Sequence, residues 1–352
     1  MADSGGTSYD VSLVRKGRIP WTRETWLGQR LRGHMTGFPS VDVRSIGAGG
    51  GSVAWVDSGG MLHVGPGSAG SVPGPVCYGQ GGTEPTVTDA ALALGYIDPE
   101  FFLGGAIKLD LDSAIHSIKT RVGDSLGLDI QATAAAIINV TSENMVQAIE
   151  DVTINQGIDP REAILIGGGG AAGLNAVKIA RRLGCTEIII PASAATLSAT
   201  GALMSDLSTE YSQTWLSFSN RFDFEGVNST LADLESRCKT FLEGRAVGEM
   251  VQSIDFSVEA RYPHQVWEIE VPLTKTRFDE QSDVALLEKD FHQLHEEMFA
   301  IADRDSHVEV VSWRARARCA LPARRGHVIK SLISGQIDSS RKIYFDSVGE
   351  VH

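Results

Sequence analysis

The 352-residue sequence has no excess of positive charge: 31 lysines and arginines stand against 44 aspartates and glutamates, which gives a net charge of −13. A protein that binds nucleic acid generally needs a basic face, so this class of function is not expected. The same net charge would repel anionic membrane surfaces. Backbone N–H groups can bind phosphate without any basic side chain, so a local anion site stays open.

Long apolar runs are also missing. No apolar stretch reaches the roughly 18 residues that a transmembrane helix requires. The first residues, MADSGG, lack the apolar region of a signal peptide. We therefore expect a cytoplasmic protein that has no nucleic-acid partner and no membrane contact.

Cysteine is scarce, and its spacing carries no motif. The four cysteines are Cys77, Cys185, Cys238 and Cys319. No two of them have the C-x-x-C spacing, so cysteine alone predicts neither a zinc site nor a redox motif. We expect free, buried thiols in a reducing compartment.

Glycine, in contrast, is abundant and unevenly distributed. Most of the 38 glycines fall before about residue 205, which indicates tight turns and close backbone contacts in that part. The rest of the chain is richer in charged and aromatic residues. The length allows two domains, so we expect an α/β domain over residues 1–207 and an α+β domain over residues 208–352.

Residue patterns in the first part predict two hairpins. The first would run from Tyr9–Val14 to Arg18–Trp21, and the second from Ser52–Val56 to Met61–Val64. The segment Gly65–Pro85 is dense in glycine, proline and serine, which predicts a long loop. A loop of this length is more often functional or packed on a partner than a passive connector.

A strand–glycine–helix–strand order follows. The expected elements are a strand at Ala163–Ile166, a helix at Leu174–Leu183 and a strand at Glu187–Pro191, preceded by a long helix at Gln131–Asn155. This order is typical of an α/β layer that contains a parallel strand pair.

The second part alternates helical and extended patterns. Helices are expected at Leu231–Val251 and Val284–Phe299, and strands at Ile254–Arg261, Val266–Val271 and Val308–Leu321. His292 and His295 lie at i and i+3 of the second of these helices and could touch one metal ion. No third ligand is apparent nearby, so packed or solvated histidines are the favoured interpretation.

The first of three glycine motifs, DSGGTSYD, covers residues 3–10. Gly5 and Gly6 let the backbone approach a phosphate, and consecutive N–H groups can form an anion-binding nest. The hydroxyl groups of Thr7 and Ser8 add further donors. The alternative is a simple turn near the chain start, because such clusters are common in turns.

The two acidic residues of this motif are candidate catalytic residues. Asp3 and Asp10 could hold Mg²⁺, usually through water, or orient a nucleophile. Asp42, upstream of the second motif, could be an acid, a base or a metal ligand. A lone aspartate at the end of a strand is more often a cap or turn residue.

The second motif, IGAGGGS at residues 46–52, lies between two β-prone runs. It lacks the Gly-Lys-Ser/Thr ending of a P-loop, and it does not open a helix as a dinucleotide fingerprint does. The third motif, IGGGGAAGL at residues 166–174, forms a strand-to-helix turn. Its small residues would let a flat ligand lie on the backbone, or they serve close helix–strand packing.

Three glycine loops on α/β supports, with acids near the first two and no P-loop lysine, indicate a nucleotide cleft. The pattern is typical of the actin and sugar-kinase type, in which paired loops hold the phosphates.

Together these motifs resemble the hydantoinase/5-oxoprolinase/acetone and acetophenone carboxylase family. Residues 3–11 resemble its D-x-G-G-T-S-x-D-V segment, and residues 41–42 with 45–56 its central glycine motif. Short segments between residues 65 and 90, among them GGTEPTVTDA at 81–90, follow the family in order, as do residues 168–175 and Ser198–Gly201. The resemblance covers about residues 1–320.

The resemblance implies a ribonuclease H-like lobe of the actin/sugar-kinase ATPase superfamily, with ATP and Mg²⁺ as cofactors. It implies ATP-dependent activation of a carbonyl or enol oxygen. The substrate would be a cyclic amide (a hydantoin or 5-oxoproline) that water opens, or a ketone that bicarbonate carboxylates without biotin. A non-catalytic split or truncated scaffold subunit is the third alternative.

Three departures from the family pattern bear on this interpretation. Family members begin with another Gly-Gly-Thr loop in an N-terminal lobe that is missing here, and they continue beyond residue 352. A Gly-Pro-Leu-His segment of the family reads Ala172–Asn175 in this chain, and Asn175 together with Glu259–Gln265 resembles the carboxylase branch more closely. The expected partners are therefore the missing lobe and a second enzyme subunit of the hydantoinase B type.

The predicted site residues fall into three groups. The catalytic group is Asp10, Asp42 and Asp3, of which Asp3 and Asp10 are also the candidate Mg²⁺ ligands. The nucleotide and phosphate group is Gly5, Gly6, Thr7, Ser8, Gly168, Gly169, Gly170 and Ala171. The active-site loop group is Gly47, Gly49, Gly50, Gly51, Ser52 and Asp89.

Overall fold

The computed structural model describes residues 1–352 apart from 16, 18, 20, 23–25, 28–31, 37–39, 155–156, 244–250, 321–339, 347 and 352. The chain divides into two compact units. Unit 1 is Met1–Gly201 with Ile329–His352, and unit 2 is Ala202–Val328. In the part of the chain that is described, no helix is both long and apolar enough to cross a membrane.

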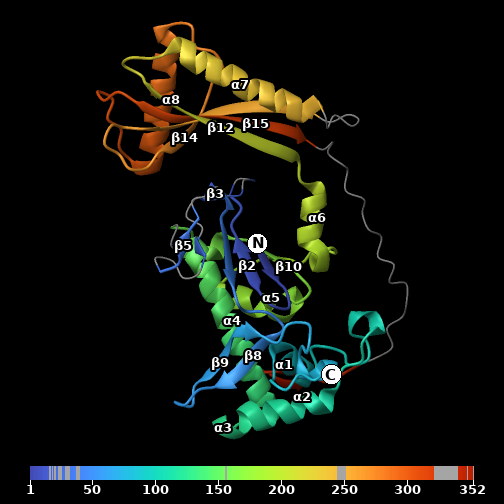
Figure 1. Cartoon of the computed structure of the whole chain (residues 1–352). Helices are drawn as coiled ribbons and strands as arrows, with labels where there is room; N and C mark the ends of the chain where they lie inside the picture. The colour runs from blue at the N-terminus through green and yellow to red at the C-terminus, as the bar shows by residue number, and fades with distance from the viewer. Residues whose placement is uncertain are drawn as a thin grey trace. The chain divides into compact units, whose positions relative to one another are not determined.

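Unit 1 is built on a five-stranded sheet with the order β11-β10-β1-β2-β7 (Figure 1). The strands are β1 (Ala2–Ser4), β2 (Tyr9–Ser12), β7 (Val43–Ile46), β10 (Leu165–Gly168) and β11 (Ile188–Ile189). β10 runs parallel to both β1 and β11, while β2 is antiparallel to β1 and β7. The α/β layer with a parallel pair is thus present, as predicted.

Two helices cover one face of this sheet. The helices are α4 (Ile130–Thr153) and α5 (Ala172–Leu183), and both contact the sheet strands. Alternate residues of β1 and β2 point toward them, so that Ala2 and Tyr9 are buried. Each helix has its own boundary signal: Asp129 accepts from the N–H of Ala132 at the start of α4, and Gly184 ends α5 at φ +75°.

The first expected hairpin is wrong. β2 pairs with β1 and β7, and Trp21 lies in β3, which pairs with β6. The return strand expected over 18–21 lies partly outside the described residues. β2 finds better partners in strands that bury its alternate side chains against α4, and local sequence cannot reveal such pairings.

A second layer of unit 1 begins with the predicted hairpin of β8 (Ser52–Val56) and β9 (Leu62–Ser68). α4 continues from the sheet to this layer and contacts both β9 and α1 (Val87–Ala93) (Figure 1). The other elements here are η1 (Val76–Tyr78), η2 (Leu103–Gly105), α2 (Leu111–Ile118), η3 (Lys119–Gly123) and α3 (Asp124–Leu126). Their buried side chains form a core that includes Val87, Ile118 and Ile137.

The remaining elements of unit 1 are short. They are β3 (Trp21–Thr22), β4 (Trp26–Leu27), β5 (His34–Met35), β6 (Ser40–Val41), η5 (Pro160–Glu162), η6 (Ala194–Thr196), β16 (Ile343–Phe345) and β17 (Gly349–Val351). The last two form a hairpin that belongs to unit 1: the N–H of Tyr344 donates to Leu94 O at 2.9 Å. The expected second domain, 208–352, therefore does not hold its own C-terminal part.

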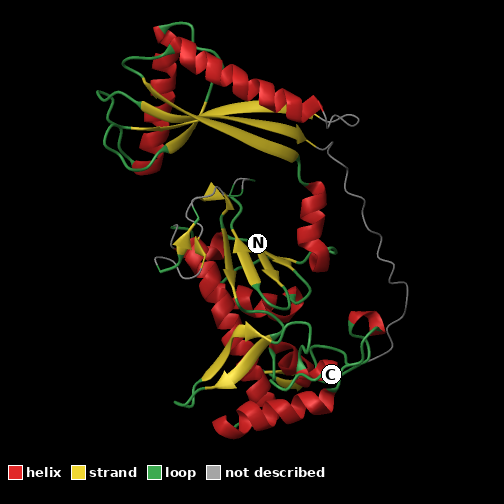
Figure 2. Ribbon diagram, viewed as in Figure 1, coloured by secondary structure: helices red, strands yellow, loops and turns green. Residues whose placement is uncertain are grey.

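Unit 2 pairs a four-stranded antiparallel sheet with two helices (Figure 2). The sheet order is β12-β15-β13-β14, with β12 (Leu207–Phe218), β13 (Val251–Arg261), β14 (Ile269–Pro272) and β15 (Glu309–Ala320). The helices are α7 (Phe224–Glu243) and α8 (Gln281–Phe299), and α6 (Leu197–Met204) spans the division between the units. The α+β character expected from the pattern is present.

One helix boundary in unit 2 differs clearly from the expectation. α7 begins at Phe224, seven residues before the predicted start, and Val251 opens β13 rather than ending the helix. Residues 244–250 lie outside the described residues. Gly226 and Asn228 are poor helix formers, so the sequence pattern places the helix start after them. In the structure, the carboxylate of Asp223 accepts from the N–H of Gly226 as a cap does.

Candidate functional site

The first two glycine motifs lie against each other in unit 1. The N–H groups of Gly50 and Gly51 donate to the carbonyl oxygens of Gly5 and Gly6, at 3.0 and 2.6 Å. A methyl group on Gly49 would lie 2.7 Å from Gly5 O, which leaves room only for glycine. Main-chain hydrogen bonds from the second motif thus fix the position of the first.

The third motif joins the same place from the neighbouring strand. Gly168 is the register partner of Asp3, and the N–H of Ala171 donates to Ser4 O at 2.9 Å. Gly169 has φ +85°, and a methyl group there would lie 2.2 Å from Ser4 O. All three glycine turns therefore meet at the end of β1.

Asp3 and Asp10 form the centre of a polar row across the open face of the sheet. They are direct register partners in the β1–β2 pair, and Asp10 is in turn the partner of Ser45 on β7. Directly opposite residues have Cβ atoms about 5 Å apart and share one face. Ala2, Ser4 and Tyr9, the alternate residues, are buried on the face toward α4 and α5.

Hydroxyl groups hold both carboxylates in place. Ser8 Oγ donates to Asp10 Oδ2 at 3.1 Å, and Ser45 Oγ donates to Asp10 Oδ1. Ser198 Oγ, from α6, donates to Asp3 Oδ2. Sequence reasoning named the two acids but gave Ser45 and Ser198 no role. The alternation of β7 places Ser45 on the same face as Asp10, but only once the β2–β7 register is known.

Backbone donors lie in the turns that follow β1 and β10. Gly6, Thr7 and Gly170 are exposed, and within the described part of the chain their N–H groups make no hydrogen bond. A turn with consecutive unpaired N–H groups can bind an anion, and α5 begins directly after the third turn. The arrangement offers N–H donors for an anion beside two carboxylates for a cation.

Asp42 lies apart from this row. It precedes Val43 at the start of β7, whereas the glycine loop follows Ile46 at the other end. Asp42 lies three positions before Ser45 in the sequence, which is about 10 Å of extended strand. The structure therefore does not bring Asp42 together with Asp3 and Asp10.

Asp89 and Ser52 hold the loops in shape rather than face solvent. The buried Asp89 carboxylate accepts from the N–H groups of Val76, Cys77 and Thr86 and from Thr86 Oγ1, at 2.8–3.2 Å. This completes a capping box at the start of α1. Ser52 Oγ is also buried and accepts from Gly49 N–H at 2.8 Å.

Gly47 contributes a close backbone approach on the far side of the second motif. A methyl group on Gly47 would lie 2.7 Å from Pro66 O. Thr88, next to Asp89, donates both its N–H and its Oγ1 to Gly50 O at 2.8 Å. The long Gly65–Pro85 segment thus packs against the glycine loop at its start, and Thr88, three residues beyond its end, binds the same loop.

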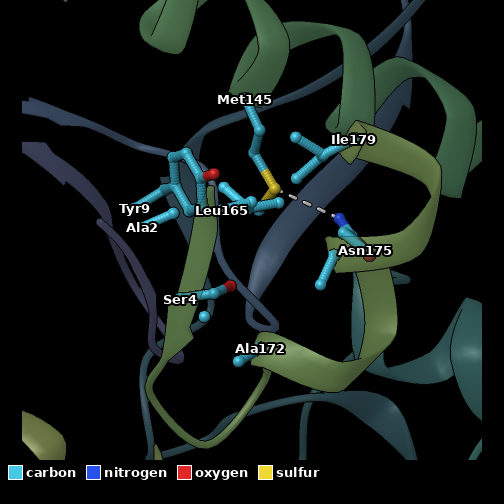
Figure 3. Close-up of a pocket in the computed structure, with 10 residues that line it drawn as sticks. Ala2, Ser4, Tyr9, Met145, Leu165, Ala172, Asn175 and Ile179 are labelled. Atoms are coloured by element: carbon cyan, nitrogen blue, oxygen red, sulfur yellow. Dashed lines mark hydrogen bonds between the residues drawn. The ribbon is translucent and has the colours of Figure 1, made fainter. Parts of the chain in front are cut away.

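A small buried cavity lies behind the sheet, on the face toward α4 and α5 (Figure 3). Its volume is about 10 Å³, and Tyr9 and Asn175 line it. Tyr9 Oη and Asn175 Oδ1 have no partner within the described structure, although Asn175 Nδ2 donates to Met145 Sδ at 3.2 Å. Burial raises the pKa of Tyr9, so its hydroxyl stays protonated. This cavity has room for about one water molecule.

The histidine pair of unit 2 is packed. Tyr262 Oη pairs with His292 Nδ1 at 2.7 Å, while His295 pairs with Ile301 O and Gln265 Nε2 at 2.7 and 3.0 Å. Both rings are buried, and burial lowers the pKa of His292. In the described portion of the chain, no group of three or more His, Cys, Asp or Glu side chains could hold a metal ion.

Comparison with known proteins gives a consistent result. The sequence profile of the hydantoinase/oxoprolinase family matches residues 1–211. The chain is 40% identical to caprolactamase subunit alpha of Pseudomonas jessenii over 314 residues, which is 88% of this chain and 44% of the relative.

Two solved structures are similar. The ATP-dependent caprolactamase from Pseudomonas jessenii superposes with a TM-score of 0.69 at 38% identity, over 92% of this chain and 46% of that chain. A nucleotide-free acetone carboxylase superposes with a TM-score of 0.74 over 91% of this chain and 46% of that chain; at 23% identity it shows the fold alone. The chain spans about half the length of the curated relatives it matches. These matches confirm the resemblance read from the sequence, and the chain belongs to the hydantoinase/oxoprolinase family.

Proposed function

We propose that this chain is part of an ATP-dependent enzyme subunit that phosphorylates the carbonyl oxygen of a cyclic amide and so drives its hydrolysis. The observation that carries the proposal is the row of Asp3 and Asp10 beside three convergent glycine turns. One face of the sheet thereby combines anion donors with cation ligands, which is what a metal–polyphosphate complex requires.

The turns fit a polyphosphate. The unpaired N–H groups of Gly6, Thr7 and Gly170 are donors that need no basic side chain. Thr7 adds an exposed hydroxyl group, while the Ser8 hydroxyl is already committed to Asp10. The turn of Gly168–Ala171 opens α5, whose N-terminus favours negative charge. We assign this third turn to the nucleotide side of the site.

The acids fit Mg²⁺. Two carboxylates directly opposite each other repel unless a cation lies between them or near them. Mg²⁺ is commonly bound by one or two carboxylates, with water and substrate phosphates completing the shell. The absence of a third acidic ligand among the described residues agrees with that mode of binding. Bound there, Mg²⁺ would neutralise charge on the phosphates.

The residues of this chain would then act by position and charge. Asp10, fixed by Ser8 and Ser45, would orient the metal or the attacking group, and Asp3, fixed by Ser198, would serve as its partner. The glycine N–H groups would stabilise charge on the transferring phosphoryl group. ATP would transfer its γ-phosphoryl group to the amide oxygen, with ADP as the leaving group, and this makes the amide carbon more electrophilic. Water would then add to that carbon, the C–N bond would break as the nitrogen takes up a proton, and a second water would release phosphate from the acyl phosphate.

The strand order supports a more specific fold. Three antiparallel strands, β7-β2-β1, continue into the parallel strands β10 and β11. We propose that unit 1 is the ribonuclease H-like lobe that forms one half of an actin/sugar-kinase type cleft. An N-terminal lobe would supply the other half, because half a cleft cannot enclose a phosphate on both sides.

Among the candidate substrates, the cyclic amide has the better support. The relative that aligns with 88% of the chain is a caprolactamase subunit, and caprolactam is a cyclic amide. The name of this relative also supports assembly with a second enzyme subunit. The hydantoinase B type subunit stays our proposed partner, and ketone carboxylation is the alternative that the experiment below separates.

The test measures MgATP binding by calorimetry and amide hydrolysis in the assembled enzyme. We expect the chain to bind MgATP, Asp10→Asn to weaken binding at least tenfold, and the hairpin variant Asp57→Asn to bind as the wild type does. With the lobe and partner subunit added, turnover of a cyclic amide should not depend on bicarbonate. Bicarbonate-dependent turnover of a ketone would favour the carboxylase. Absence of MgATP binding in both preparations would support a scaffold and contradict the proposal.

A further inference from the structure

A second, larger cavity opens in unit 1 away from the polar row. Its volume is about 410 Å³, which falls within the range of small-molecule sites, roughly 300–1,000 Å³. It lies where the end of β7, the strand β9 and the helix α4 meet. Ile46 lines it, whereas the preceding Ser45 belongs to the polar row, so the cavity and the row lie on opposite faces of the sheet edge.

One wall of the cavity carries a histidine that two neighbouring side chains hold in place. His63 Nε2 contacts Asp57 Oδ2 at 2.8 Å, and the His63 ring stacks on Trp55 with centroids 4.5 Å apart. Asp57 is itself fixed by the N–H groups of Gly59 and Met61, each at 2.9 Å. The hairpin β8–β9 therefore presents the imidazole in one orientation.

The protonation pattern follows from this contact. The hydrogen bond from His63 holds the pKa of the Asp57 carboxyl below its usual range, so Asp57 is ionised and Nε2 is the donor. In the neutral ring, Nδ1 then carries a lone pair, and it has no partner within the described residues. The neutral form of His63 offers the cavity a hydrogen-bond acceptor whose position is set by Asp57.

The facing wall belongs to α4 and offers carboxamides. Asn144 and Gln147 lie at i and i+3, on one face of the helix. Asn144 Nδ2 reaches Val64 O at 3.4 Å, and no hydrogen bond of the Gln147 carboxamide is found in the described part of the chain. Apolar surface from Val64, Pro66 and Val140 fills the space between these polar groups.

We propose that this cavity binds a small, uncharged cyclic amide. The amide N–H would donate to His63 Nδ1, the amide oxygen would accept from a carboxamide of α4, and the ring methylenes would contact Val64 and Val140. Among the described residues that line this cavity there is no lysine or arginine, which disfavours a phosphate or carboxylate ligand. The inference rests on the proposed function, because the ligand class is that of its substrate.

The cavity is connected to the phosphate turns through one loop. Gly47 and Ala48 line the cavity, and Gly50 and Gly51 of the same loop bond to the carbonyl oxygens of Gly5 and Gly6. A methyl group on Gly65 would lie 2.4 Å from Gly47 O, so the cavity wall at Gly65 packs closely against the glycine loop of the second motif. A ligand in the cavity therefore contacts the segment that supports the first glycine turn.

The test titrates three uncharged cyclic amides, 2-piperidone, ε-caprolactam and hydantoin, into the chain with ¹⁵N-labelled tryptophan. The indole signal of Trp55, assigned with Trp55→Phe, reports ligands next to His63. We expect at least one amide to shift this signal at saturation. His63→Phe, which keeps a ring for stacking, should weaken binding about tenfold, and Gln147→Leu about three- to tenfold.

Matched controls use the same chemistry elsewhere. His116→Phe changes an exposed histidine of α2, and Gln131→Leu changes an exposed glutamine of α4 about 24 Å along the helix from Gln147. Both should bind the amide as the wild type does.

A second control changes the ligand. N-methyl-2-piperidone lacks the N–H, so the wild type should bind it about tenfold more weakly than 2-piperidone. His63→Phe should bind these two ligands equally.

Two results would overturn the inference: no shift of the Trp55 signal with any of the three amides, or amide binding by His63→Phe and Gln147→Leu that is as tight as that of the wild type. MgATP binding is measured on the same samples. Loss of amide binding with MgATP binding intact removes this inference alone, whereas loss of MgATP binding with amide binding intact removes the proposed function alone.

Discussion

The two units of this chain reach their folds by different means. In unit 2 the centre is aromatic: Trp313, Phe278 and Phe291 are at most 1% exposed, and the ring of Phe222 packs edge-on against Trp313. In unit 1 the three glycine turns pack by main chain on main chain, with buried neighbours as small as Ala2 and Ala48. The packing of unit 2 therefore depends on large side chains. The packing of unit 1 near its site depends on residues that have little or no side chain.

This difference has a functional reason. A side chain at a glycine turn would cover the N–H groups that are to face a phosphate, so the loops that serve the site must be held by backbone contacts. Unit 2 has no such demand among its described residues and can fill its interior with large rings. The comparison predicts opposite sensitivities: removing atoms should harm unit 2 most, and adding atoms should harm unit 1 most.

The largest effect is expected for Trp313→Ala. The side chain is fully buried and its Nε1–H donates to Trp215 O at 3.0 Å, so truncation leaves a large cavity and leaves this carbonyl with the weaker bond from Ser217 Oγ at 3.3 Å. We expect a loss of about 3–5 kcal/mol in the free energy of unfolding of unit 2. Hydrogen exchange should show weaker protection of β13 and β15 but not of β1 and β10. The exposed Trp267→Ala is the control.

A single added methyl group should harm unit 1 nearly as much. Gly169→Ala introduces a Cβ atom at φ +85°, 2.2 Å from Ser4 O, and we expect a loss of about 3 kcal/mol. Gly170→Ala, one residue along, meets no atom within 4 Å and should change stability by less than about 0.5 kcal/mol. Urea denaturation of the two variants measures the difference. Equal stability of Gly169→Ala and Gly170→Ala would contradict the claim that close main-chain packing limits unit 1.

Asp89→Asn comes next in size. The amide keeps the shape but replaces one carboxylate oxygen, which accepts backbone N–H groups, by a donor. We expect a loss of about 2 kcal/mol, and faster proteolysis within 65–85, because the loop loses its anchor. Asp110→Asn, at the exposed cap of α2, should cost nearly nothing since asparagine caps as well. Similar losses in both variants would argue against the anchoring role.

The smallest expected effect is a dependence on pH in unit 2. The hydrogen bond from Lys275 lowers the pKa of Asp283 from 3.8 to about 2. Because the folded-state pKa lies below the unfolded one, this contribution to stability is present above about pH 4 and is lost as the pH falls toward 2. As the pH is lowered from 5 to 2, the thermal unfolding midpoint of the wild type should fall more steeply than that of Asp283→Asn. Parallel curves would contradict this assignment.

Much of the fold was readable where the pattern is local. The helix at 130–153, the β8–β9 hairpin and the strand–turn–helix at 165–183 have continuous periodicity and a glycine or aspartate at their ends. The sheet order was not readable, because β1 is three residues long and pairs with β10, some 165 residues away. Such pairings depend on a shared buried face rather than on nearby residues.

The site divides in the same way. Asp3, Asp10 and the glycines could be named from their own motif, but Ser45 and Ser198 act only through long-range register. The glycine motif predicts Asp89 in the active-site loop, but the spacing of Thr86 and Asp89 is that of a capping box, and the sequence contains this signal.

The central claim is that the turns at the end of β1 hold a polyphosphate, and its most direct test uses Mn²⁺ in place of Mg²⁺. Bound MnATP should broaden the backbone amide signals of Gly6 and Gly170 and leave sharp those of Gly60 and of Gly127, which ends α3 in the second layer of unit 1, because paramagnetic broadening falls steeply with distance. Asp10→Asn should abolish this selective broadening. Equal broadening at all four glycines, or broadening that persists in Asp10→Asn, would contradict the account.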